Sequence, residues 1–237
     1  MFGLYQSLSE TALLLILGLG ILGYQGKSAD ISKMLIAVIS FFMYKSILYE
    51  GFGLLSFPDV IPGKYNWEGK LASLVLLVLI SFLAFGKDWD GVGWTRKIQN
   101  KKKTWTVTGV LFVLYGLYAL FYLSGRIQED ANSFLYQISM PGFSEEWMYR
   151  GVLFALLIPT AEAQKKEFWP AAIAITLLFA FTHAFRITGE VELTFNTGNF
   201  IYALVTGSAF MYLRVLSGSL WVPILLHAWF NAAGYFL

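Results

Sequence analysis

The sequence predicts an all-α membrane protein in which about eight transmembrane helices enclose a polar cavity, and three observations support this fold class. Hydrophobic residues make up 57% of the 237 residues and charged residues only 14%, whereas soluble domains carry about 25% charged residues. The apolar runs are continuous rather than alternating, and in lipid this pattern favours helices over a closed β-barrel. Aromatic residues reach 18%, which fits a protein that anchors Trp and Tyr at membrane interfaces.

Eight apolar segments approach the length of about 20 residues that a spanning helix needs. The first, third and fifth are short, and we expect them to extend into their flanks. The second carries Lys45 and Glu50, so we expect it to be kinked or partly interfacial, with these two charges paired or lining a cavity. In chain order the predicted spans are Thr11–Tyr24, Ile31–Phe57, Leu71–Phe85, Thr104–Ser124, Phe143–Ile158, Trp169–Arg186, Phe200–Leu216 and Leu220–Leu237.

The spans form a single membrane-embedded domain in two halves. Spans one to four occupy residues 1–125, and spans five to eight form a helical core over residues 126–237. Between spans four and five, Ile127–Ile138 is typical of a short amphipathic helix on the membrane surface. The absence of cysteine excludes disulfides, thiolate metal sites and a cysteine nucleophile. The net charge of +2 does not indicate a nucleic-acid partner, and the sequence predicts no oligomeric state.

Basic residues gather between spans three and four. The segment contains Lys87, Arg96, Lys97, Lys101, Lys102 and Lys103. The positive-inside rule places such a segment in the cytoplasm. With eight spans, both termini then face the opposite side. The first apolar segment lacks a basic n-region, and we expect it to be kept as an anchor rather than cleaved as a signal peptide.

Charged residues at the start of span five are the first candidate catalytic residues. Glu146 and Arg150 are four residues apart, so they lie on one helix face in the favourable order for an ion pair. Glu145 is about 100° further round the helix, so the two acids should have different surroundings. We expect Pro141–Gly142 to break the chain just before them and Ser144 to cap the helix. A structural ion pair alone accounts for Glu146 and Arg150 but leaves Glu145 unexplained.

The chain has only two histidines, and both fall in apolar spans. A single histidine in a membrane helix is often only an interhelical hydrogen bond. His183 lies near the end of span six. His227 and Asn231 are four residues apart and share a face of span eight, where both can donate hydrogen bonds to a developing oxyanion. Two histidines together with an acid pair therefore favour a reactive site over isolated structural contacts.

Three short motifs resemble those of the CPBP family of membrane proteases. They are Glu145-Glu146-x-x-x-Arg150, Phe179-x-x-x-His183 and His227-x-x-x-Asn231. The family contains the CAAX-processing type II prenyl endopeptidases and the bacteriocin-processing and immunity-associated membrane proteins. The resemblance runs from about Pro141 to Gly234, and the motifs occur in the family's order. Residues before about 125 are similar only in forming membrane helices.

The resemblance implies a glutamate-type intramembrane endopeptidase whose eight helices enclose a catalytic cavity. On this basis Glu145 and His183 activate the attacking water, and His227 and Asn231 form the oxyanion hole. Phe179 packs the site, and the remaining two motif residues support the first acid or position the substrate. No cofactor is expected. The six implied catalytic residues are Glu145, Glu146, Arg150, His183, His227 and Asn231.

The sequence leaves three other functions open. Glu145, His183 and His227 have the donor types of a zinc site, although their spacing differs from the His-Glu-x-x-His helix of metalloproteases. A catalytically silent family member would keep the motifs and act as an immunity or scaffold protein. A transporter would instead disperse its charges along a pathway and often repeat its halves, and we find neither feature.

The expected partners are a peptide or protein substrate, either lipidated or unmodified, and membrane lipids. We expect a multi-pass protein of the cell membrane if the source is a bacterium, or of the endoplasmic reticulum membrane if it is a eukaryote. The positive-inside rule places the site toward the non-cytoplasmic side, whereas a CAAX tail would be cleaved from the cytosol, so these two expectations conflict.

Outside the motifs, we expect Arg186 on a solvated loop, where it is a candidate contact for a substrate carboxylate. We expect Asn196 in a turn or cap, and Arg214 extended toward the interface.

Overall fold

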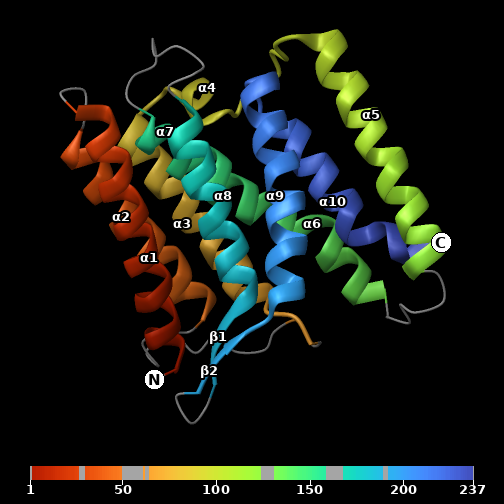
Figure 1. The fold of residues 1–237 in the computed structure, drawn as a ribbon, viewed down its shortest axis with the longest axis horizontal. Helices are drawn as coiled ribbons and strands as arrows, with labels where there is room; N and C mark the ends of the chain where they lie inside the picture. Colours follow the sequence, from red (N-terminus) through yellow and green to blue (C-terminus); the bar gives the residue numbers. More distant parts are fainter. Residues whose placement is uncertain are drawn as a thin grey trace.

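The computed structural model describes residues 2–26, 30–49, 61, 64–123, 131–158, 168–188 and 192–236. This part of the chain is a helical bundle with one short β-hairpin at its base (Figure 1). Its α-helices are α1 (Phe2–Gln25), α2 (Ile31–Leu48), α3 (Trp67–Phe85), α4 (Trp89–Val92), α5 (Lys101–Tyr118), α6 (Ala131–Glu146), α7 (Phe154–Leu157), α8 (Trp169–Ala184), α9 (Thr197–Ser217) and α10 (Trp221–Phe236). The π-helical segments are η2 (Ala119–Leu123) and η3 (Trp147–Leu153), and the strands are β1 (Phe185–Ile187) and β2 (Leu193–Phe195).

Polar side chains cap the N-termini of several helices. Asp30, Asn66 and Asn196 accept hydrogen bonds from the backbone N–H groups three residues further on, at the starts of α2, α3 and α9. Such caps satisfy donors that the first helical turn leaves free. The predicted turn or cap role of Asn196 is confirmed. At the other end of α9, Gly218 ends the helix with a φ of 72°, a left-handed conformation that glycine adopts without strain.

One continuous helical run passes through the middle of the bundle. It consists of α6, η3 and α7 in direct succession. Pro141 lies inside α6, so the predicted chain break at Pro141–Gly142 and the predicted cap at Ser144 are both wrong. Membrane helices tolerate an internal proline where neighbouring helices hold the segment, and α6 packs against both α3 and α10. The surface helix predicted for Ile127–Ile138 is replaced, from Ala131 onward, by the first turns of α6.

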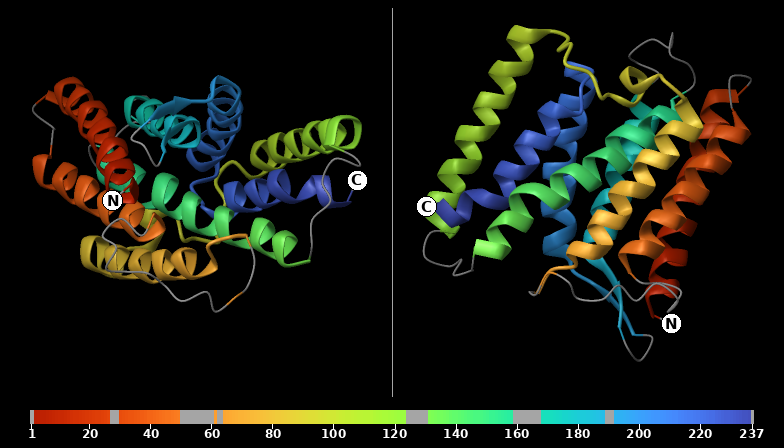
Figure 2. Two further views of the ribbon diagram at one scale, coloured as in Figure 1. Left: turned by 90° about the horizontal axis from the view of Figure 1, so that it is seen from below. Right: turned by 180° about the vertical axis from the view of Figure 1, so that it is seen from behind.

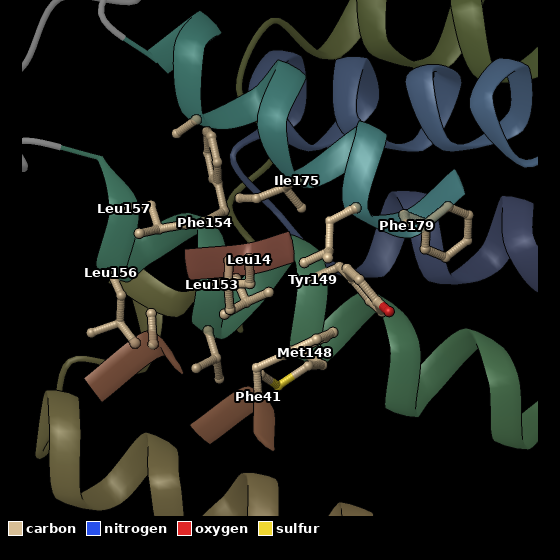
Figure 3. Packing of buried hydrophobic residues seen from close by; sticks show 14 of the residues in the cluster. Leu14, Phe41, Met148, Tyr149, Leu153, Phe154, Leu156, Leu157, Ile175 and Phe179 are labelled. Atoms are coloured by element: carbon tan, nitrogen blue, oxygen red, sulfur yellow. The ribbon is translucent and has the colours of Figure 1, made fainter. Parts of the chain in front are cut away.

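The core lies around η3 and α7. Figure 3 shows Met148, Tyr149 and Leu153 of this run packed against Leu14 of α1 and Phe41 of α2. Side chains of α8 complete the same buried cluster from the other side. The cluster therefore joins both halves of the sequence and holds the central helix in a fixed position.

Among the residues that the structure describes, five helices are long and apolar enough to cross a membrane, judged by length and composition. They are Gly3–Gln25, Ile31–Leu48, Trp67–Phe85, Lys101–Tyr122 and Thr197–Ser217. Their outer faces expose large apolar side chains, such as Leu83 with 81% of its surface accessible, as expected for helices in contact with lipid. The other three predicted spans fall on the α6–η3–α7 run, on the shorter apolar helix α8 and on α10. An all-α membrane fold is thus present, and the count of eight spans stays a prediction.

Two predicted spans end earlier than expected. Span two was expected to reach Phe57, but α2 ends at Leu48, and Glu50 lies outside the described residues. Lys45 pairs with Glu10 of α1, with 2.8 Å between Nζ and Oε2. Span six was expected to reach Arg186, but α8 ends at Ala184 because the chain turns into the β-hairpin, a local departure from the all-α prediction.

The β-hairpin is attached to the N-terminal helix. Strands β1 and β2 are antiparallel, with Phe185 opposite Phe195. Gln6 of α1 donates to the Phe185 carbonyl at 3.0 Å and accepts from the Ile187 N–H at 2.7 Å. The hairpin lies at the opposite end of the bundle from α4 and the neighbouring basic segment (Figure 1). Helix α5 lies at the edge of the bundle beside α10 (Figure 2).

Candidate active site

Glu146 is the centre of a fully buried charge network. Its Oε1 accepts hydrogen bonds from Arg150 Nη1 at 3.2 Å and from His227 Nδ1 at 2.8 Å. Arg150 Nη2 also donates to the carbonyl of Gly207 in α9, at 3.0 Å. The predicted ion pair between Glu146 and Arg150 is therefore present. Because Nδ1 of His227 donates to a carboxylate, its Nε2 is left for other partners.

Phe179 of α8 connects this network to the second histidine. The Arg150 guanidinium lies 4.2 Å from the centroid of the Phe179 ring, a cation–π contact. The same ring meets His227 edge-on, with 6.3 Å between centroids. The Phe179 carbonyl accepts a hydrogen bond from His183 Nδ1 at 2.8 Å. Since a carbonyl only accepts, the proton must be on Nδ1, and His183 presents Nε2 to the other side.

Glu145 has different surroundings from Glu146, as predicted. Its Oε1 accepts a hydrogen bond from Lys70 Nζ of α3 at 2.8 Å. Its Oε2 lies 3.5 Å from His183 Nε2. This second oxygen is buried and has no hydrogen-bond partner among the described residues. The carboxylate is thus held at one oxygen and directed at an imidazole with the other.

Two cavities meet at His183. The first has a volume of about 200 Å³ and contains Glu145 in its wall, with Lys70 and Arg186 around it. The second, of about 70 Å³, is lined by Phe179, His227 and Asn231. His183 belongs to the walls of both. His183 is therefore shared by a cavity that contains a carboxylate and a cavity lined by two groups that can act as hydrogen-bond donors.

The structure brings together most of the residues that the sequence singled out. One set contains Glu145 and His183, and the other contains Glu146, Arg150 and His227. Asn231 lies one turn beyond His227 on α10 and lines the same cavity. The three motifs, separated along the chain, therefore converge on one pair of cavities.

Lys70 was missed by the sequence reasoning. It stands directly before the predicted third span, where a lysine resembles an ordinary interfacial anchor. In the structure it lies in the first turns of α3 and is only 7% exposed. A single charge next to an apolar run was the one available signal, since its partner Glu145 is 75 residues away.

Arg214 was predicted to extend toward the interface, and this prediction is wrong. The residue is 7% exposed, and its Nε donates to the Arg150 carbonyl of η3 at 3.0 Å. A π-helix has wider turns than an α-helix and occurs often at functional sites. The Arg214 side chain therefore contacts the irregular segment that follows the two acids and helps to hold it.

The zinc interpretation receives no geometric support. Within the described ranges, no three His, Asp or Glu side chains are grouped closely enough to hold a metal ion. Glu145 and His183 are close, but the Nδ1 of His227 donates to Glu146 instead of joining them. The donor set that zinc prefers, three or four groups around one point, is not assembled.

Residues 127–233 match the family model described as type II CAAX prenyl endopeptidase Rce1-like. The matched region contains all three motifs, whereas Lys70 lies outside it. No curated protein and no solved structure matches the chain significantly. With its membrane-length apolar helices, the chain has the features of a multi-pass membrane protein, and over residues 127–233 it is similar to the Rce1-like type II CAAX prenyl endopeptidases.

Proposed function

We propose that the protein is a glutamate-dependent intramembrane endopeptidase in which Glu145 and His183 activate water, and His227 and Asn231 stabilise the oxyanion. The observation that carries this proposal is the position of His183 between two cavities. Peptide hydrolysis needs a base and a water on one side of the scissile carbonyl and hydrogen-bond donors near its oxygen. The two cavities that share His183 contain these two sets of groups in their walls.

On the first side, Glu145 is the general base. Its free Oε2 and the Nε2 of His183 are 3.5 Å apart, so one water molecule can donate a hydrogen bond to each at an ordinary distance. The water oxygen attacks the carbonyl carbon as Glu145 takes up a proton. That proton then passes to the leaving amine when the carbon–nitrogen bond breaks, which returns the carboxylate to its starting state.

On the second side, His227 and Asn231 face the position of the substrate oxygen. The Nδ1 of His227 is bound to Glu146, so Nε2 is the nitrogen left to contact the oxyanion. The Glu146 carboxylate fixes the orientation of this imidazole. Asn231 adds a neutral amide donor. Glu146 and Arg150 thus act behind the reacting groups, as supports for His227.

The surroundings favour an apolar or lipidated peptide as substrate. A groove of about 500 Å³ lies between α5 and α9 and is lined mainly by apolar side chains. It shares Tyr202, Thr206 and Phe230 with the cavity that contains His227 and Asn231. An apolar chain in this groove would place the adjoining peptide bond next to the donor groups.

The test is cleavage of an internally quenched, prenylated CAAX-type peptide by the purified full-length protein in lipid nanodiscs. Glu145→Gln should abolish cleavage with the fold retained, and Asn231→Ala should lower kcat by about 10²–10³-fold, the usual effect of removing an oxyanion donor. Asp90→Asn, an exposed acid at the far end of the bundle, is the matched control and should cleave normally.

Three results would contradict the proposal. Cleavage by Glu145→Gln at the wild-type rate would remove Glu145 as the base. Loss of activity on metal removal, with recovery on adding zinc, would favour the metalloprotease. If well-folded wild-type protein fails to cleave both prenylated and unmodified membrane peptides, the scaffold or immunity function becomes the better explanation.

A further inference from the structure

We propose that Lys70 is a positioning residue of the active site, which keeps Glu145 ionised and directs its free oxygen at His183. This inference rests on the proposed function of Glu145 as the base. Lys70 belongs to α3, in the half of the chain that the family match does not cover. Through Lys70, the N-terminal helices take part in the catalytic site and are more than a membrane anchor.

Lys70 is fixed by two hydrogen bonds. Its Nζ lies 2.8 Å from Glu145 Oε1 and 3.0 Å from Ser144 Oγ. The Ser144 hydroxyl donates its own proton to the Met140 carbonyl at 2.9 Å. Its lone pairs are therefore left to accept from the lysine. Two consecutive residues of α6 thus bind a single ammonium group from α3.

This arrangement divides the two oxygens of Glu145 between separate tasks. Oε1 is occupied by Lys70, so Oε2 is the oxygen left to face His183 and the first cavity. A buried carboxylate without a counter-charge is costly to ionise. The nearby ammonium offsets that cost, and the base form of Glu145 is available before substrate binds.

A second buried ion pair on the same cavity wall provides a comparison. Lys45 and Glu10 are 2.8 Å apart, the same separation as Lys70 and Glu145, and both lysines line the first cavity. Lys45, however, pairs with an acid of α1 and not with the catalytic one. Loss of either lysine breaks a buried pair, so only a specific effect on Glu145 distinguishes a positioning role from a structural one.

The experiment measures kcat, KM and the pH profile of kcat for full-length variants in nanodiscs with the prenylated peptide. Lys70→Met and Lys70→Gln should lower kcat at neutral pH by on the order of tenfold or more, with a small change in KM. The acid limb of the profile should move to higher pH, because Glu145 without its cation binds a proton more readily. Lys70→Arg should recover most of kcat and the wild-type profile.

The matched control is Lys45→Met, which should lose stability while its acid limb stays in the wild-type position. If Lys70→Met does not fold, Lys70→Gln keeps an amide donor for Ser144 and still tests the charge. Wild-type profiles in Lys70→Met or Lys70→Gln would overturn the inference, as would equal shifts in the Lys70 and Lys45 variants.

Failure of this inference differs from failure of the proposed function. If Glu145→Gln is inactive while the Lys70 variants keep the wild-type kcat and pH profile, Glu145 stands as the base and Lys70 is only structural. If Glu145→Gln cleaves normally, the proposed base itself is wrong.

Discussion

Arg150 has more buried contacts than its ion pair with Glu146 alone. The side chain is fully buried and contacts the Gly207 carbonyl and the ring of Phe179 as well as the acid. Glu146 in turn holds His227. Removal of one partner from a buried pair is more damaging than removal of both, because the remaining charge is left in an apolar interior.

Arg150→Met should therefore lower the free energy of unfolding by about 3–5 kcal/mol and also reduce cleavage. The double variant Glu146→Gln/Arg150→Met should be more stable than Arg150→Met and still cleave poorly, because His227 has lost its carboxylate. Denaturant unfolding in detergent micelles, together with the peptide assay, measures both effects. If Arg150→Met is as stable as the wild type, the buried charge of Glu146 does not need Arg150 as its partner.

At this scale, the sequence predicted contacts along one helix and missed contacts between helices. The Glu146–Arg150 pair follows from a spacing of four residues, and the shared cavity of His227 and Asn231 follows from the same rule. The partners of Lys70 and Arg214 lie 75 and 64 positions away. Spacing along the chain gives no information about such pairs. Lys70 meets its partner only because α3 packs against α6, and Arg214 meets its partner only because α9 lies beside η3.

Glycines set the distance between the helices that carry the site. A Cβ on Gly142 of α6 would lie 3.2 Å from the backbone oxygen of Ile224 in α10. A Cβ on Gly207 of α9 would lie 2.9 Å from the ring of Phe179. The contact between Glu146 and His227 depends on the first of these close approaches, because the two residues lie on α6 and α10.

Gly142→Ala should weaken the contact between α6 and α10. Since the added methyl group faces backbone, we expect a loss of about 1–3 kcal/mol in stability, the usual cost of overpacking, and a lower kcat from displacement of His227. Gly109→Ala is the matched control, because nothing lies within 4 Å of that position on α5. It should be neutral or stabilise by up to about 1 kcal/mol. Equal effects of the two substitutions would contradict this explanation.

The sequence predicted helices where apolar runs are long, and its errors fall where tertiary packing overrides a local signal. Pro141–Gly142 is a typical breaker pair, yet the helix continues through it because α3 and α10 pack against it. The β-hairpin after α8 is too short to give a periodic pattern, and Gln6 of α1 holds it from a distant part of the chain.

At the scale of the whole molecule, the basic segment and the site lie at opposite ends. Lys70 is near the start of α3, and the basic segment begins just after that helix ends. The hairpin next to His183 is at the far end from α4 (Figure 1). Since basic segments favour the cytoplasm, we expect the site to face the non-cytoplasmic side.

Single-cysteine labelling tests this orientation without background, because the chain contains no cysteine. A membrane-impermeant maleimide should label Thr194→Cys in intact cells and Asp90→Cys only in inverted vesicles, since both positions are exposed and lie at opposite ends of the bundle. The reverse pattern would place the site in the cytosol, the side from which a CAAX tail is expected to be cleaved. Labelling of both from one side would contradict the arrangement of the helices.

Because of the π-helical segment η3, the direction in which the two acids point depends on how many residues separate them from α7. The wide turn between Trp147 and Leu153 already holds about one residue more than an α-helical turn. If a further residue were inserted there and wound as regular α-helix, everything before it would turn by about 100° relative to α7. Glu145 and Glu146 would swing away from Lys70 and His227 although no chemical group of the site had changed. We therefore expect this stretch to accept many substitutions of similar size but no inserted residue.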